Sequence, residues 1–169
     1  MTLHQSSSRR ATVGAYLLVA GQFALLLVLI LWKPRARWVL PRGLDTAASA
    51  LGFLGAAWLV VGAVSLGRSL SAVPLPLVHG KLKTGGLFRL SRHPIYTGLL
   101  AIAWSVAVRG GSPYPLAVAG GLTVLLHIKA RFEETALEEV YPEYAGYAAR
   151  TPRFLPRPVR LVRELRGGS

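Results

Sequence analysis

Two long stretches of this chain contain no charged residue, and they constrain its fold more than any other feature. The first covers residues 11–32 and the second covers residues 46–66. A helix of about 22 residues is roughly 33 Å long at ~1.5 Å per residue, which is enough to cross the ~30 Å hydrocarbon core of a bilayer. We therefore expect both stretches to be transmembrane helices.

Two shorter apolar stretches follow, at residues 94–108 and 114–128. Each would form roughly 22 Å of helix, which is less than the ~30 Å hydrocarbon core. The glycine-rich segment from Arg109 to Pro113 between them is a strong turn signal. The pattern predicts a short helical hairpin. Either flanking residues complete the crossing, or the second helix continues into the aqueous phase beyond His127.

The second long stretch carries signals for its start and for its packing. Asp45 and Thr46 stand at its beginning, where such side chains can cap a helix. Small residues let membrane helices approach closely, although glycine is also simply frequent in such helices. The glycines open to these two interpretations are Gly52, Gly55, Gly62 and Gly67.

Composition supports a membrane protein rather than a soluble one. The chain is 52% hydrophobic, yet its formal net charge is +13. This apolar content excludes a disordered basic tail, and the absence of cysteine excludes a disulfide-stabilised secreted scaffold. Because the basic residues flank apolar stretches, they indicate a membrane and not a nucleic acid as the partner. We expect an all-α integral membrane protein of one domain, residues 1–169, with about four transmembrane helices.

The distribution of Lys and Arg predicts the orientation. With four crossings, both termini lie on one side of the membrane. That side carries 15 of the 20 Lys and Arg, whereas the other side carries 5. The positive-inside rule therefore predicts cytoplasmic termini, in what we expect to be the cell (inner) membrane. The basic tail, residues 157–169, would contact the anionic inner leaflet.

Two polar segments are more than a bundle of helices would need as connections. The first covers residues 81–98. Pro94 is suited to the first position of a helix, which places His93 at or near the cap. Unpaired N–H groups and the positive end of the helix dipole would then lie beside Arg92, where an anionic group could bind. Taken singly, Arg92 could equally be an interfacial charge and Tyr96 a residue of an aromatic belt.

The second segment, residues 129–156, holds most of the acidic residues. Five of the seven carboxylates lie within eleven positions directly after the fourth apolar stretch. Glu133 and Glu134 are nearest the membrane, where an unpaired carboxylate is unfavourable, so a cationic ligand or Arg92 is expected as a partner. We expect the remaining three to be solvated. These are Glu138, Glu139 and Glu143.

Together the two segments resemble a known superfamily of integral-membrane methyltransferases, typified by isoprenylcysteine carboxyl methyltransferase and phospholipid methyltransferases. The first matching block consists of Gly85, Arg89, Arg92, His93, Pro94, Tyr96 and Gly98. The second block consists of Arg131, Glu133, Glu134, Leu137, Tyr144, Tyr147 and residues 152–156. The blocks flank the short hairpin in the order and spacing of that superfamily, whereas the first two helices match only in hydropathy.

The resemblance implies S-adenosylmethionine as the cofactor and a lipophilic or prenylated acceptor that approaches from the bilayer. Glu133 or Glu134 would bind the ammonium or ribose groups of the cofactor, and Arg92 would hold an anionic group, so these three are the expected catalytic residues. No metal is expected. Other cofactor contacts would come from His93, Pro94, Tyr96, Gly98, Tyr144 and Tyr147.

Two other functions are also considered. Sterol and steroid reductases that use NADPH resemble this pattern in their C-terminal region, but they typically have more crossings. A non-enzymatic lipid-binding protein would explain the arginine-rich tail, but it would not explain Glu133 and Glu134. A methyltransferase accounts for both motif segments.

Overall fold

Helices form the whole regular structure of the described part of the chain. The computed structural model describes residues 2–32, 38–67 and 82–155, and the side chains of α1 from residue 13 onward. Every regular element in these ranges is helical, which confirms the all-α prediction. The elements are α1 (Thr2–Leu31), α2 (Arg42–Leu66), the 3-10 turn η2 (Gly86–Arg89), α3 (Pro94–Arg109), α4 (Pro113–Val140) and α5 (Tyr144–Arg150). The basic tail, residues 157–169, lies outside the described residues.

Three of the helices are long and apolar enough to cross a membrane, namely α1, α2 and α4. The fourth apolar helix, α3, has 16 residues and is shorter. The expected turn is present, since α3 ends at Arg109 and α4 begins at Pro113. The second helix of the hairpin does continue past His127, since α4 extends to Val140.

The expected cap of α2 is wrong. The helix begins at Arg42, with Pro41 at the N-cap position and no side-chain cap. Asp45 therefore lies inside the first turn, where it pairs with Arg109 Nε at 2.9 Å. Thr46 Oγ1 donates to the Arg42 carbonyl instead of capping the helix.

Close packing of α2 on α3 depends on small residues. A Cβ built on Gly55 would lie 2.9 Å from the Gly98 carbonyl oxygen, and one built on Gly98 would lie 2.5 Å from the Gly55 carbonyl oxygen. Gly52 similarly faces Ser105. These contacts favour the packing interpretation of the glycines. Gly67 differs, since it ends α2 with φ 53° and has open space around it.

A second contact region joins α1, α3 and α4. Alanine, valine and leucine side chains fill it, so the backbones of these helices also lie near one another. The buried members are Leu29, Ala103, Ala107, Val118, Ala119, Leu122 and Leu126. Much of the outer surface of α1 and α2 is exposed and apolar, as in Phe53 and Ile30, which are 79% and 72% exposed.

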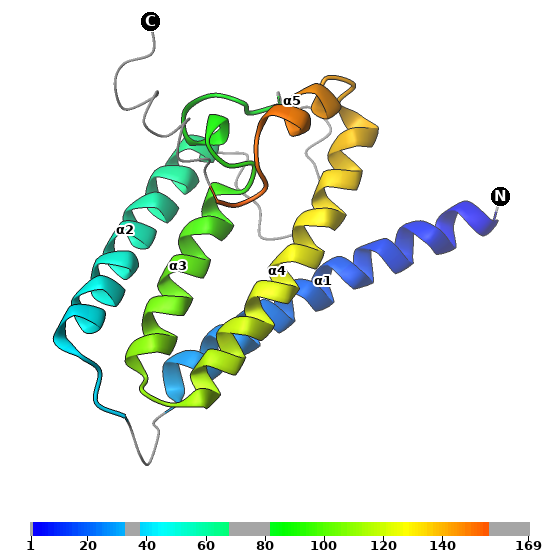
Figure 1. Cartoon of the computed structure of the whole chain (residues 1–169). Coiled ribbons are helices and arrows are strands. Elements are labelled where there is room, and N and C mark those ends of the chain that lie inside the picture. Colours follow the sequence, from blue (N-terminus) through cyan, green and yellow to red (C-terminus); the bar gives the residue numbers. More distant parts are fainter. Residues whose placement is uncertain (1, 33–37, 68–81, 156–169) are drawn as a thin grey trace, which may run out of the picture.

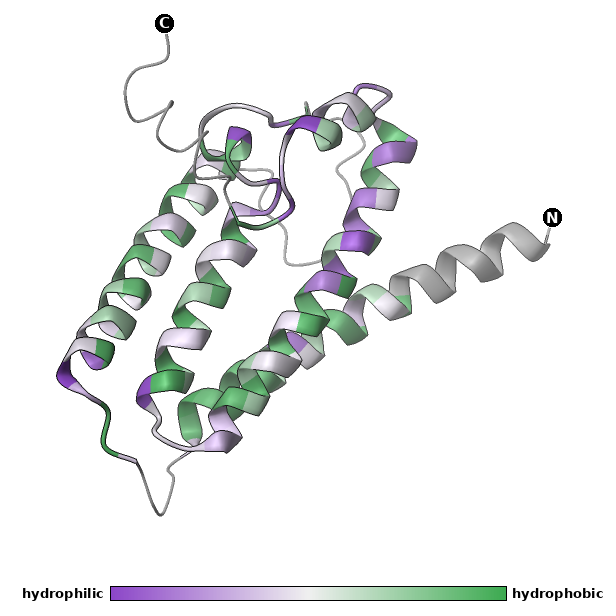
Figure 2. Ribbon diagram, viewed as in Figure 1, coloured by the Kyte–Doolittle hydropathy of each residue, from purple (hydrophilic) through white to green (hydrophobic). Residues whose placement is uncertain are grey.

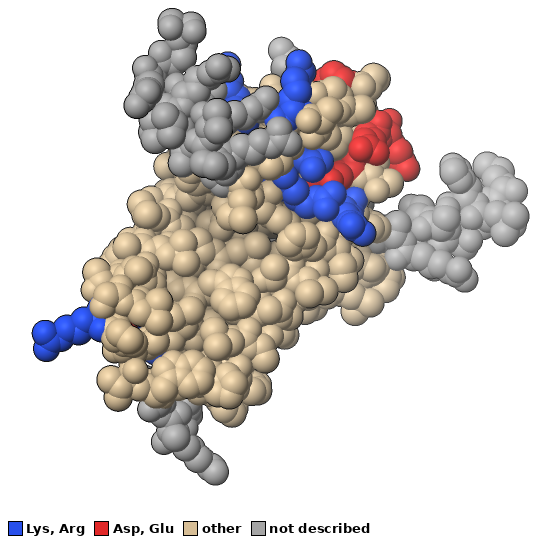
Figure 3. Space-filling view, in the orientation of Figure 1, with Lys and Arg blue, Asp and Glu red and all other residues tan. Residues whose placement is uncertain are grey.

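Polar residues gather at one end of the bundle. The C-terminal half of α4, α5 and the segment that precedes α3 meet at this end (Figure 1). Figure 2 shows hydrophilic residues concentrated there and predominantly apolar ribbons between the two ends. In the space-filling view of Figure 3, an uncharged band separates Lys and Arg at one end from the mixed charges at the other. This band is the surface that a bilayer would cover.

Candidate functional site

Backbone pairing joins the two motif blocks. The backbone N–H of Arg92 donates to the Pro152 carbonyl at 2.9 Å, and that of His93 donates to the Arg153 carbonyl at 3.1 Å. Thr97 Oγ1 adds a hydrogen bond to a third consecutive carbonyl in this segment, that of Phe154. Residues 60 positions apart in the chain therefore form one structural unit at the start of α3.

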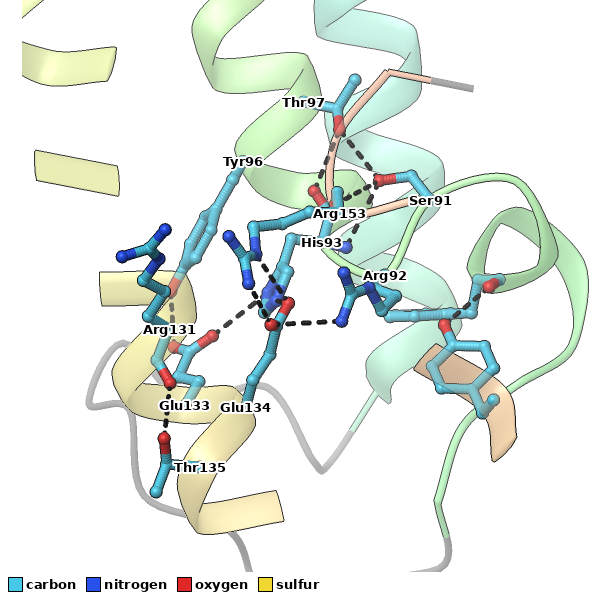
Figure 4. A network of polar contacts seen from close by, with 12 residues as sticks. Ser91, Arg92, His93, Tyr96, Thr97, Arg131, Glu133, Glu134, Thr135 and Arg153 are labelled. Atoms are coloured by element: carbon cyan, nitrogen blue, oxygen red, sulfur yellow. Dashed lines mark hydrogen bonds and ion pairs between the residues drawn. The ribbon is translucent and has the colours of Figure 1, made fainter. Parts of the chain in front are cut away.

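Pro94 begins α3, and His93 is its N-cap residue, as predicted. The imidazole of His93 does not cap the helix. Its two nitrogens instead face α4, where Nδ1 lies 3.2 Å from Glu133 Oε2 and Nε2 lies 3.0 Å from Glu134 Oε1 (Figure 4). The helix start thus directs a buried histidine onto two carboxylates.

Glu134 is the centre of the ionic cluster. Arg153 binds it through two hydrogen bonds, from Nε to Oε1 at 3.0 Å and from a terminal nitrogen to Oε2 at 2.6 Å. Arg92 contacts Oε2 at 3.1 Å, and His93 contacts Oε1. A carboxylate has about four acceptor positions, so these partners use its full capacity. Hydrogen bonding to Glu134 raises the pKa of the Arg153 guanidinium, which stays charged.

Glu133 differs from Glu134 in having acceptor capacity left. Its Oε1 accepts the hydroxyl of Tyr96, and its Oε2 faces His93 Nδ1. These two contacts use about half of the hydrogen-bond acceptor positions of a carboxylate. Its side chain is also 18% exposed, against 8% for Glu134. Glu133 is therefore the carboxylate of the pair that can accept a bound group.

The remaining acidic residues of α4 and the loop after it face water. Glu138, Glu139 and Glu143 are all exposed, as expected for solvated charges. The partner expected for a carboxylate near the membrane is present for Glu134, since Arg92 binds it. The acidic segment thus divides into two residues in the cluster and three on the surface.

The contacts of His93 favour its positively charged form. A neutral imidazole has one donor nitrogen, whereas both nitrogens of His93 face carboxylate oxygens. Burial lowers the pKa of His93, but hydrogen bonds and charges from Glu133 and Glu134 outweigh burial and raise it above its ordinary value. The protonated form links the two carboxylates.

This protonation predicts a pH dependence of stability. The pKa of His93 is higher in the folded protein than in the unfolded chain, so its contribution is fully present below the unfolded pKa of about 6.5. The contribution is lost as the pH rises through the folded pKa. We expect the free energy of unfolding in detergent to fall over this range, and His93→Gln to remove most of the fall. His127→Gln is the control, because His127 is exposed, and a fall that persists in His93→Gln would contradict the assignment.

The two tyrosines of the second block differ in their contacts. Tyr147 donates its hydroxyl to the Phe88 carbonyl at 2.6 Å, which ties α5 to η2. Burial raises the pKa of Tyr147, and it raises that of Tyr144 to about 12. The buried hydroxyl of Tyr144 and the buried Nε of Arg92 have no hydrogen-bond partner among the described residues. The two side chains lie near each other, since Arg92 lowers the pKa of Tyr144 in opposition to burial.

Gly98 lies at the contact between α3 and α2 rather than in the ionic cluster. Its missing Cβ leaves room for the Gly55 carbonyl and for Leu59. Pro94 is buried at the start of α3. Of the residues expected to bind the cofactor, the structure therefore brings together His93, Tyr96 and the two glutamates.

Sequence reasoning assigned no role to two residues of the site, Arg153 and Lys129. Arg153 belongs to the second matching block. Its positive charge is the signal from which a contact with the acidic segment could have been predicted. Lys129 directly follows the fourth apolar stretch and is only 2% exposed. Ionisable residues at such depth are often functional, which is the signal that could have identified it.

Comparison with known proteins gives a match that contains most of this site. Residues 46–144 match the family described as phospholipid methyltransferase. A curated relative, the cobalt-zinc-cadmium resistance protein CzcN of Cupriavidus metallidurans, is 32% identical over 108 residues, or 63% of this chain and 48% of the relative. The chain thus matches about half the length of that relative. No solved structure matches the chain.

Proposed function

Because the chain belongs to the phospholipid methyltransferase family, a family of membrane methyltransferases, we propose that it transfers a methyl group from S-adenosylmethionine to a lipophilic acceptor. The transfer would occur at the cytoplasmic face of the cell membrane, where the positive-inside rule places the polar end of the bundle. The family match agrees with the resemblance seen in the two motif blocks.

The observation that carries this proposal is the unequal use of the two carboxylates. Glu134 is fully occupied by Arg92, Arg153 and His93. Glu133 keeps acceptor positions and partial exposure in the same charged cluster. Glu133 would accept the ammonium group of the cofactor, and Glu134 would hold the binding residues in place.

Other residues at the site fit the same cofactor. Buried polar atoms without a partner are uncommon and need a reason. The Nε of Arg92 and the hydroxyl of Tyr144 are two such atoms, and both could hydrogen-bond to polar groups of a bound nucleoside or amino acid. Arg92 could also complement the carboxylate of the methionyl part. The donor set thus suits a zwitterionic ligand with a nucleoside.

The chemistry expected of the protein is mainly binding and alignment. S-adenosylmethionine supplies a methyl group that its sulfonium has already activated, so the chain must align the acceptor and exclude water. A carboxylate or thiolate acceptor needs no base, whereas an amine or hydroxyl does. Both nitrogens of His93 face carboxylates and Glu134 has no free acceptor position, so an acceptor that needs a base would have to reach Glu133, the carboxylate that also faces the cofactor ammonium.

The position of the cluster suits a lipophilic acceptor. His93 directly precedes α3, and Glu133 and Glu134 follow the apolar first half of α4, so the cluster lies next to the apolar parts of both helices. Exposed apolar side chains continue along α1 and α2 from this level across the uncharged band. An acceptor dissolved in the bilayer could therefore place its polar group at the cluster without leaving the lipid.

Binding of the cofactor by purified protein tests this proposal. We expect the protein in lipid nanodiscs to bind S-adenosylmethionine and S-adenosylhomocysteine in calorimetric titrations, and to show no binding of NADPH under the same conditions. The comparison separates a methyltransferase from a membrane reductase. Binding of NADPH alone would overturn the proposed function.

A further inference from the structure

A buried lysine connects α1 to the candidate site. Lys129 lies on α4 and is 2% exposed. Its Nζ donates to Gln22 Oε1 of α1 at 2.8 Å. Gln22 is a polar residue in the middle of the first apolar stretch, and polar groups at this depth normally have a specific partner. This hydrogen bond joins α1 to α4.

The same ammonium also contacts Tyr96. Nζ of Lys129 lies 5.1 Å from the centroid of the Tyr96 ring, within the range of a cation–π interaction. The Tyr96 ring is stacked with that of His93, with an angle of 3° between the planes and 5.3 Å between the centroids. Tyr96 is thus held by contacts with two cationic side chains.

Tyr96 in turn fixes Glu133. Its hydroxyl donates to Glu133 Oε1, and the other oxygen of Glu133 faces His93 Nδ1. The cation on the ring withdraws electron density from the phenol, which makes its hydroxyl a better donor to the carboxylate. A continuous series of contacts therefore leads from Gln22 through Lys129 and Tyr96 to Glu133.

We propose that Lys129, held by Gln22, is a positioning residue that orients Glu133 through Tyr96. Its meaning for methyl transfer rests on the proposed function, whereas the orientation of Glu133 is a property of the protein alone. The proposal gives α1 a role at the site, although α1 lies outside residues 46–144 of the family match. Burial of an ammonium is unfavourable, and an apolar side chain of similar length would pack between the helices without that cost.

Titration of His93 tests this positioning without any ligand. The protein labelled with ¹⁵N-histidine contains four histidines, and His93→Gln identifies the His93 signals. Glu133 and Glu134 contact the imidazole directly, Arg92 and Arg153 pair with Glu134, and Lys129 lies over the ring of Tyr96, which is stacked on His93. We expect Gln22→Leu, which removes no charge, to loosen Glu133 and lower the pKa of His93 by up to about one pH unit, a tenfold change in proton binding.

Lys129→Met separates positioning from a simple effect of charge. Removal of a positive charge near His93 would by itself raise the pKa of His93, whereas loss of an oriented Glu133 would lower it. We expect the loss of orientation to outweigh the loss of charge, which gives His93 a lower pKa in Lys129→Met and a pKa near that of the wild type in Lys129→Arg. If Lys129→Met does not fold, the charge-neutral Gln22→Leu decides the question.

Thr123→Val is the matched control. Thr123 Oγ1 accepts a hydrogen bond from Trp104 Nε1 between α3 and α4 and donates one to the Ala119 carbonyl, so its polar contacts lie outside the series from Gln22 to Glu133. We expect this variant to titrate like the wild type. An unchanged pKa of His93 in Gln22→Leu, or a raised one in Lys129→Met, would overturn the proposal. Binding of S-adenosylhomocysteine by the same wild-type samples tests the proposed function separately.

Discussion

Replacing Glu134 with glutamine is expected to destabilise the protein by about 3 kcal/mol, because it removes a buried carboxylate that three basic side chains share. Arg92, Arg153 and His93 all contact this carboxylate, whose side chain is 8% exposed. Removal of one member of a buried ionic group typically costs about 3–5 kcal/mol. We expect the lower end of this range, since Arg153 is 26% exposed and can turn toward water.

Unfolding by denaturant in detergent micelles measures this loss. Glu138→Gln is the matched control, because Glu138 lies four residues further along the helix and is exposed. We expect little change in the control. Equal unfolding transitions for Glu134→Gln and Glu138→Gln would show that Glu134 does not hold the two motif blocks together.

Replacing Glu133 with glutamine is expected to weaken cofactor binding strongly and to reduce the stability of the protein only slightly. Glu134→Gln, in contrast, is expected to act mainly on stability. A hydrogen bond to a charged group contributes roughly 1.5–3 kcal/mol, so the dissociation constant for S-adenosylhomocysteine should rise about 10- to 100-fold. The amide can still accept from Tyr96, which preserves part of the local structure. Calorimetric titration of the purified variant gives the dissociation constant.

Glu139→Gln serves as the control for Glu133→Gln, since it removes the same charge from an exposed position of α4. Its affinity should match that of the wild type. If Glu133→Gln binds as tightly as this control, Glu133 does not contact the cofactor. The pair Glu133→Gln and Glu134→Gln thus distinguishes a binding carboxylate from a structural one.

The sequence was sufficient to predict the helices because hydropathy and turn signals act locally. The apolar stretches, the turn after Arg109 and the start of α3 at Pro94 all follow from short patterns. The start of α2 was predicted wrongly, because Asp45 is a good cap in isolation. In the folded chain it pairs with Arg109, which lies 64 residues away.

The contents of the site were predictable only in part. The motif blocks identified His93 and both glutamates, but the division of labour between Glu133 and Glu134 depends on which partners reach them. Arg153 reaches Glu134 because three backbone carbonyls after α5 pair with the segment before and within α3. Such pairing between distant residues leaves no periodic signal in a single sequence.

Lys129 and Gln22 illustrate the same limit within the membrane helices. Each is one polar residue at or within an apolar stretch, and nothing in the sequence indicates that they face each other. Their contact depends on how α1 packs against α4. Gly98 was expected from the sequence to contact the cofactor, whereas the structure places it against the Gly55 carbonyl and Leu59 of α2.

Transfer of a labelled methyl group tests the central claim most directly. Membranes from cells that express the wild-type chain, Glu133→Gln or Glu139→Gln would be incubated with S-adenosylmethionine carrying a tritiated methyl group, and the lipid fraction would then be extracted and counted. We expect label in lipid with the wild type and Glu139→Gln, and at least about tenfold less with Glu133→Gln. Equal labelling by wild type and Glu133→Gln, or none above membranes that lack the protein, would contradict it.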